Sequence, residues 1–220
     1  MHEATATNRD DKSFRSELEA LNQVKTILLT MVKEEFDNNQ KLIDFIVKRI
    51  SGAREVISRR RQTHLYDSEI RELLPSSKAV ERGLPKRVKV KSLNNEEMYI
   101  TLGVSEEEAY HVTSISRYRM KCTCWDSIRT SSVADKRLTD IIKLLDADKS
   151  LQQATVFSKY IICKHTIASL ARAIYLGQLE LSDEELLNTL RLALLGAYLR
   201  VEENLNKELL GKVLSKVKKI

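Results

Sequence analysis

Apolar residues recur at spacings of three and four in the first third of the chain, the pattern of amphipathic helices that bury one face. Two breaks, Asn38-Asn39 and Ser51-Gly52, interrupt this pattern and are expected to end helices. The segments predicted to be helical are residues 12–37, about 43–51, about 53–63 and about 70–74. Short helices joined by brief loops form bundles. The pattern therefore predicts a helical bundle over residues 12–84, preceded by a disordered terminus over residues 1–11.

The periodicity changes to two residues in the middle of the chain, which is the signature of half-buried strands. Arg87-Val88-Lys89-Val90-Lys91 alternates strictly, and Ser92-Leu93-Asn94-Asn95 follows as a plausible turn. Two more strands are expected at residues 98–102 and 110–120, the latter leading directly into Cys122. These segments predict an antiparallel sheet within a β-rich unit.

Helical periodicity returns after the sheet. A short helix is expected at residues 138–145, a buried strand at Tyr160-Ile161-Ile162, and a helix at residues 166–175 that Gly177 ends. Ser182 and Glu185 have the spacing of a helix-capping box, which opens a leucine-rich helix before a last one over about residues 203–218. The leucines of this C-terminal hairpin either pack in the core or form an interface with a partner or a second copy.

These elements predict an α+β protein with an N-terminal helical bundle, a central antiparallel sheet and C-terminal helices. The units expected after the bundle are residues 85–177, which include an insertion at residues 126–158, and the helical hairpin at residues 178–220. Hydrophobic residues make up 42% of the 220, enough for a core, and no apolar run approaches the ~20 residues of a membrane-spanning helix. Because the first residues lack a signal-peptide pattern, we expect an intracellular protein, cytoplasmic or nucleoid-associated.

All three cysteines and one of the four histidines fall into one pattern, Cys122-x-Cys124 followed by Cys163-x-His165. Three thiolates and an imidazole are a common tetrahedral ligand set for a structural Zn²⁺ ion. Inert packing of buried cysteines and redox chemistry are the alternatives, and the odd cysteine count argues against a disulfide framework. Both cysteines of the first pair can reach one ion only where their strand bends or ends.

The net charge of +6 is concentrated around these four residues, since residues 85–175 hold 15 Lys and Arg against 10 Asp and Glu. Basic surfaces attract the phosphates of nucleic acids, although a solvated surface has the same composition. Candidate nucleic-acid contacts are Arg59, Arg60 and Arg61 on the predicted third helix, Lys89, Lys91, Arg117, Arg119 and Lys121 on the sheet, and Lys164 between two ligands.

The ligand pattern and its flanks resemble the SWIM zinc finger. Met120-Lys121-Cys122-Thr123-Cys124-Trp125 is similar to the strand-borne first half of that finger, and Ile162-Cys163-Lys164-His165 to the start of its helix. The resemblance covers roughly residues 87–175, and the 38 residues between the two pairs exceed the usual gap. It implies a ββα finger with one closed structural zinc site.

The resemblance also implies a function in binding DNA or other proteins. Small standalone SWIM proteins include recombination mediators of the Shu-complex type, which pair with RecA-family recombinase paralogues. We therefore expect a non-enzymatic accessory factor in DNA recombination or repair; the alternative is a protein–protein adaptor that uses its C-terminal helices. His64 and His111 are isolated in the sequence, and no catalytic triad or carboxylate pair can be assembled from the spacing.

Overall fold

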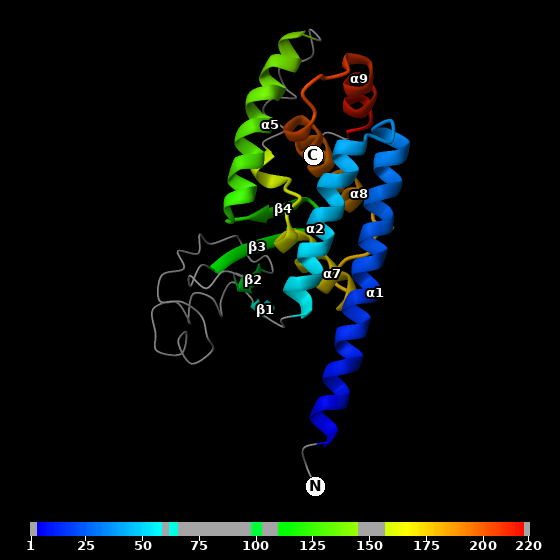
Figure 1. Cartoon of the computed structure of the whole chain (residues 1–220), viewed down its shortest axis with the longest axis vertical. Helices are drawn as coiled ribbons and strands as arrows, with labels where there is room; N and C mark the ends of the chain where they lie inside the picture. The colour runs from blue at the N-terminus through cyan, green and yellow to red at the C-terminus, as the bar shows by residue number, and fades with distance from the viewer. Residues whose placement is uncertain (1–3, 59–61, 66–97, 103–109, 145–156, 218–220) are drawn as a thin grey trace.

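The computed structural model describes residues 4–58, 62–65, 98–102, 110–144 and 157–217 (Figure 1). Its helices are α1 (Ala4–Glu35), α2 (Gln40–Ser58), α5 (Trp125–Leu144), α7 (Lys164–Tyr175), α8 (Glu184–Val201) and α9 (Lys207–Lys216), with a 3₁₀ turn η1 (Phe157–Lys159). Its strands are β1 (Gln62–Leu65), β2 (Met98–Leu102), β3 (Tyr110–Ser116) and β4 (Arg119–Cys122). Helices thus lie at both ends of the chain and a sheet in its middle, which confirms the α+β class.

Helix α7 lies at the centre of the molecule. It packs against α1 and α2 on one side and against β3 and β4 on the other. A hydrogen bond of 2.6 Å between the buried hydroxyls of Thr113 on β3 and Ser169 on α7 joins the helix to the sheet. The helix that carries the second ligand pair is therefore held between the helical layer and the strands that carry the first pair.

Helices α1, α2, α5, α7, α8 and α9 contribute to one continuous hydrophobic core. In α8 the apolar side chains are buried around nearly the whole circumference because α5, α1 and α2 surround the helix. Four apolar residues of α9 are also buried in this core. Core packing, the first of the two alternatives, thus accounts for the C-terminal leucines.

The described strands form an antiparallel sheet in the order β1-β2-β3-β4. Strand β2 has the predicted bounds, but the single strand expected over residues 110–120 was wrong. The chain reverses at Arg117-Tyr118, so that Ser116 pairs with Arg119 in a hairpin. Bulky residues occupy this turn instead of the glycine or asparagine that identifies most two-residue hairpins. The sequence therefore carried no signal from which the turn could be predicted.

The expected break between a second and a third helix was also wrong, because α2 runs unbroken through Gly52. A Cβ atom at this position would lie 3.0 Å from Cβ of Lys164, so the glycine allows close approach of α2 and α7. Residues 62–65 form β1 and do not extend a third helix. Helix α1 begins at Ala4, which corrects the disordered terminus expected over residues 1–11, because no helix breaker separates Ala4 from residue 12.

Three further corrections concern the second half of the chain. Helix α5 begins at Trp125, immediately after the first ligand pair, and not near residue 138. The expected strand at Tyr160-Ile161-Ile162 consists of a single parallel bridge from Tyr160 to Met120. Asp183, not Ser182, caps α8, because its carboxylate accepts hydrogen bonds from two backbone N–H groups of the first turn.

Several predictions lie outside the described residues: the helix at residues 70–74, the strand at residues 87–91 and the polar end of the insertion. In the part of the chain that the structure describes, none of the helices combines the length and the apolar character required to cross a membrane.

Candidate metal centre and an adjoining basic pocket

Two segments distant in the sequence bring the four predicted ligands together. Cys122 is the last residue of β4, and Cys124 lies in the short connection between β4 and α5. Cys163 is the N-cap of α7, and His165 lies in the first turn of that helix. The first pair therefore sits where a strand ends, as the Cys-x-Cys spacing required.

The four ligand atoms all lie within 4.8 Å of one another, and Sγ of Cys122 is 3.8 Å from Nδ1 of His165. A tetrahedral ion with metal–sulfur bonds of about 2.3 Å separates its ligand atoms by about 3.8 Å. The donor set and its spacing therefore fit such an ion. These residues form a compact Cys₃His cluster that can hold a metal ion, and Cys124, Cys163 and His165 are each less than 5% exposed.

The electrostatics of the cluster favour one thiolate in the absence of a metal. Burial raises the pKa of Cys122, and burial also raises the pKa of Cys163, to about 11. Hydrogen bonds from these two thiols lower the pKa of Cys124 far below its usual range. An ion that binds three thiolates must therefore displace protons from Cys122 and Cys163, so its affinity falls as the pH is lowered.

Neighbouring polar groups hold the sulfur atoms in place. The Ser127 hydroxyl lies 3.0 Å from Sγ of Cys124, and the backbone N–H of Cys124 donates to Sγ of Cys122 over 3.4 Å. On α7, Cys163 and Thr166 cap the helix reciprocally: the Thr166 N–H donates to Sγ of Cys163, and the Cys163 N–H donates to Oγ1 of Thr166. The cysteine thus serves both as helix cap and as candidate ligand.

The structure describes four of the nine candidate nucleic-acid contacts, three of them on the β3–β4 hairpin and the fourth on α7. Arg117 is exposed in the β3–β4 turn, where its guanidinium lies 3.6 Å from the carboxylate of Asp183. Arg119 and Lys121 are only half-buried on β4, and Nε of Arg119 donates to Oγ of Ser114. Lys164 lies in the first turn of α7, with its side chain next to Gly52 of α2. Arg59, Arg60, Arg61, Lys89 and Lys91 lie outside the described residues.

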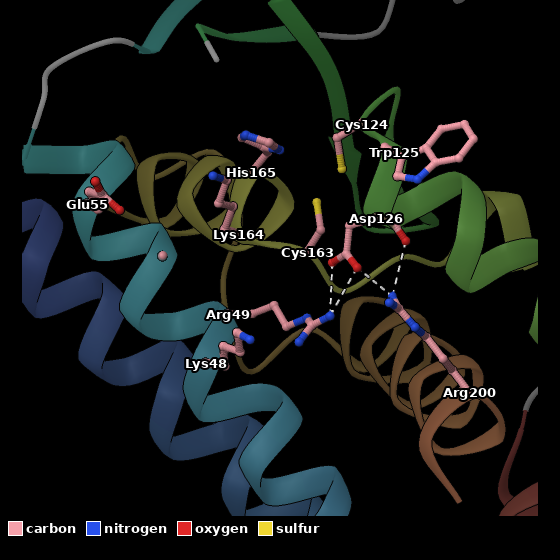
Figure 2. A pocket seen from close by; sticks show the side chains of 11 residues that line it. Lys48, Arg49, Glu55, Cys124, Trp125, Asp126, Cys163, Lys164, His165 and Arg200 are labelled. Carbon is pink, nitrogen blue, oxygen red and sulfur yellow. Dashed lines mark hydrogen bonds and ion pairs between the residues drawn. The ribbon is translucent and has the colours of Figure 1, made fainter. Parts of the chain in front are cut away.

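Sequence reasoning missed a pocket of about 560 Å³ beside the cluster (Figure 2). Three of the candidate ligands form part of its wall, and the other lining residues come from α2, α5, α7 and α8. Figure 2 shows Arg49 and Arg200 converging on Asp126, which is 3.1 Å from Nη2 of Arg49 and 2.6 Å from Nη1 of Arg200. Residues so far apart in the sequence carry no motif that could have revealed this arrangement.

Comparisons with protein-family models, with curated proteins and with solved structures found no match.

Proposed function

We propose that this chain is a SWIM-type zinc-finger protein that associates with nucleic acid, with DNA favoured, as an accessory factor in recombination or repair. The observation that carries the proposal is the Cys₃His cluster, whose ligand atoms lie within 4.8 Å of one another at the end of a hairpin strand and the start of a helix. In this proposal the ion is structural, since four protein ligands leave no coordination position for a reacting water.

Zinc is the ion that best suits these ligands. It accepts thiolate and imidazole in tetrahedral geometry, whereas magnesium and calcium prefer oxygen ligands at higher coordination number. The ion would fix the end of β4 against the start of α7 and so contribute to the stability of this part of the fold. The hairpin β3–β4 followed by α7 agrees with the ββα arrangement that the resemblance implied, with α5 inserted between them.

Nucleic-acid binding draws support from the charge around the cluster. Arg117 is exposed on the hairpin, and four basic residues line the adjoining pocket. Positive groups bind phosphates with release of counterions, which makes affinity depend on salt. The adaptor alternative has less support, because the C-terminal leucines that suggested it are buried in the chain's own core.

The zinc proposal is tested by elemental analysis of the purified chain. We expect about one zinc ion per chain. A strong chelator should remove this zinc and lower the thermal stability, and reloading with zinc should restore the zinc content and the stability. A Cys163→Ser, His165→Ala double variant should retain no stoichiometric zinc. A folded wild-type chain without metal, with thermal stability indifferent to chelation, would contradict the proposal.

The binding proposal is tested by fluorescence anisotropy with labelled single- and double-stranded DNA and RNA, titrated in salt. Zinc-loaded wild-type protein should bind with an affinity that falls as salt increases, and the double variant should bind more weakly. Lack of binding by folded, zinc-loaded protein would overturn this part of the proposal and favour the adaptor, including a recombinase-like protein partner.

A further inference from the structure

The pocket beside the metal centre has an excess of positive charge. Its lining includes four basic side chains, those of Lys48, Arg49, Lys164 and Arg200, against two carboxylates, those of Glu55 and Asp126, and the zinc-loaded Cys₃His cluster, whose three thiolates leave one net negative charge. Asp126 accepts hydrogen bonds from both arginines, so these three side chains hold one another in place. Arg49 is further fixed by the Phe45 ring, whose centroid lies 3.3 Å from the guanidinium carbon of Arg49. The arginines are therefore a rigid part of the pocket wall.

The positive charges of the two pocket lysines, Lys48 and Lys164, are not neutralised by ion pairs within the described part of the chain. Among the described residues, no ion pair or side-chain hydrogen bond involves Lys48 or Lys164. They come from different helices, Lys48 from α2 and Lys164 from the first turn of α7, and both reach the pocket. Helix α7 begins here, as does α5, and the N-terminus of a helix favours an anion. An anionic group such as a phosphate suits the space between the lysines.

An exposed aromatic side chain, that of Trp125, also lines this pocket. Trp125, the only tryptophan of the chain, is 77% exposed even though tryptophan is usually well buried in folded proteins. It is the first residue of α5 and directly follows the ligand Cys124, so its backbone is held near the metal centre. Figure 2 shows its ring directed away from Asp126 and the arginines. Ile128, one turn further along α5, is also exposed.

We infer that this pocket and Trp125 form a binding site for a single strand of nucleic acid. A base stacks on the exposed indole, and a neighbouring backbone phosphate enters the pocket between Lys48 and Lys164. Proteins that bind single strands combine these two features, a basic groove for the backbone and aromatic side chains for the bases. A duplex does not satisfy the site, because its bases are stacked on one another and their faces are covered. The inference rests on the proposed nucleic-acid function and specifies the form of nucleic acid recognised.

The single tryptophan makes the test direct, since the intrinsic indole fluorescence of the zinc-loaded protein reports on residue 125 alone. We expect dT20 to quench this emission and to bind more tightly than a 20-base-pair duplex. Trp125→Ala should weaken dT20 binding, measured by anisotropy, about tenfold or more, and Trp125→Phe should restore part of the loss. Tyr175→Ala is the matched control, because Tyr175 is an exposed aromatic residue at the opposite end of α7.

The lysines are tested through the salt dependence of dT20 binding. Lys48→Gln and Lys164→Gln should each reduce the slope of log affinity against log salt by about 0.7, the value for one lost phosphate contact on a single strand. Lys33→Gln, on the exposed surface at the end of α1, should leave the slope unchanged. Tighter binding of dT20 than of rU20 would support the DNA preference in the proposed function, and tighter binding of rU20 would overturn that preference while leaving the single-strand site intact.

The outcomes separate this inference from the function on which it rests. Wild-type protein that binds duplex as tightly as dT20, without quenching, would overturn the single-strand site and leave nucleic-acid binding intact. Equal affinity of the Trp125→Ala variant and the wild type for dT20 would do the same. Failure of zinc-loaded wild-type protein to bind any nucleic acid would overturn the proposed function, and with it this inference.

Discussion

At the scale of single residues, the Cys₃His cluster is supported by groups that are not candidate ligands. Ser127 is buried in the first turn of α5, and its hydroxyl lies 3.0 Å from Sγ of Cys124. A hydrogen bond from this hydroxyl stabilises the Cys124 thiolate and contributes to its lowered pKa. Outer groups of this kind orient metal ligands and tune their basicity. We therefore expect Ser127 to support metal binding by the cluster, although the ligand motif does not include it.

Replacing Ser127 by alanine should weaken zinc affinity about tenfold or more without loss of the fold, because the sulfur loses its hydrogen-bond donor. A competition titration of zinc against a chelating indicator dye measures this change. Ser131→Ala is the matched control, since Ser131 lies one turn further along α5 and donates to the carbonyl of Ile128. Equal zinc affinities of the Ser127 variant and the wild type would show that the hydroxyl does not support the cluster.

At the scale of elements, close contacts between helices depend on two glycines. Gly52 allows α2 to approach α7, and Gly196 allows the buried ring of Phe157 to pack directly on α8. A Cβ atom at position 196 would lie 2.8 Å from Cδ1 of Phe157, a ring that is fully buried and cannot move freely. Glycine lowers intrinsic helix stability, so its presence here reflects packing and not backbone preference.

Gly196→Ala should lower the free energy of unfolding by about 1–3 kcal/mol. The cost of forcing a methyl group against Phe157 exceeds the gain in helix propensity from replacing glycine by alanine. Gly211→Ala, in α9, is a matched control with no heavy atom within 4 Å of the added Cβ. It should raise the free energy of unfolding by up to about 1 kcal/mol. Urea denaturation of the zinc-loaded variants measures both, and stabilisation by both substitutions would contradict the packing argument.

At the scale of the whole molecule, ion pairs join the two ends of the chain. Arg191 of α8 donates to both carboxylate oxygens of Glu35 on α1, over 2.7 and 2.9 Å. Glu202, the C-cap of α8, accepts from the side chains of Asn39 and Lys41, residues at the start of α2. The hydrogen bond from Asn39 and that from Lys41 lower the pKa of Glu202 to about 2. These contacts hold α8 against α1 and the start of α2.

Glu202→Gln should lower the free energy of unfolding at neutral pH by about 1 kcal/mol, the contribution of a partly exposed charged contact. The ionised carboxylate binds its partners, so its stabilising effect is present above the unfolded-state pKa of 4.5 and declines as the pH falls toward about 2. Urea denaturation of the wild type and the Glu202→Gln variant between pH 7 and pH 2 measures this effect. The difference between their free energies of unfolding should narrow below about pH 4.5.

Glu208→Gln is the control for this comparison, because Glu208 forms only an exposed pair with Lys212 on the same helix. It should leave the free energy of unfolding nearly unchanged throughout the same pH range. A Glu202 variant whose difference from the wild type persists undiminished at pH 2 would show that its effect does not come from the carboxylate charge.

Sequence reasoning succeeded for features that depend on neighbouring residues and failed for features that depend on contacts between distant segments. Strand β2 was predicted with its full bounds, and Gly177 was identified as the residue that ends α7, where it has a positive φ of 69°. Local periodicity and backbone freedom determine both features. The break at Gly52 was wrong because contact with α7 outweighs the low helix propensity of glycine. The hairpin at Arg117-Tyr118 was missed because its residues do not mark a turn.

The sequence by itself determined the candidate metal ligands. Three cysteines and a histidine in the pairs Cys-x-Cys and Cys-x-His can be identified as one set of metal donors from their spacing alone. It also determined the α+β class, because periodicity is a local property of the chain. Only the tertiary structure decided that the C-terminal leucines belong to the core, and that Arg49, Asp126 and Arg200 meet beside an exposed Trp125. Such contacts depend on how whole helices pack, and no local stretch of sequence encodes that packing on its own.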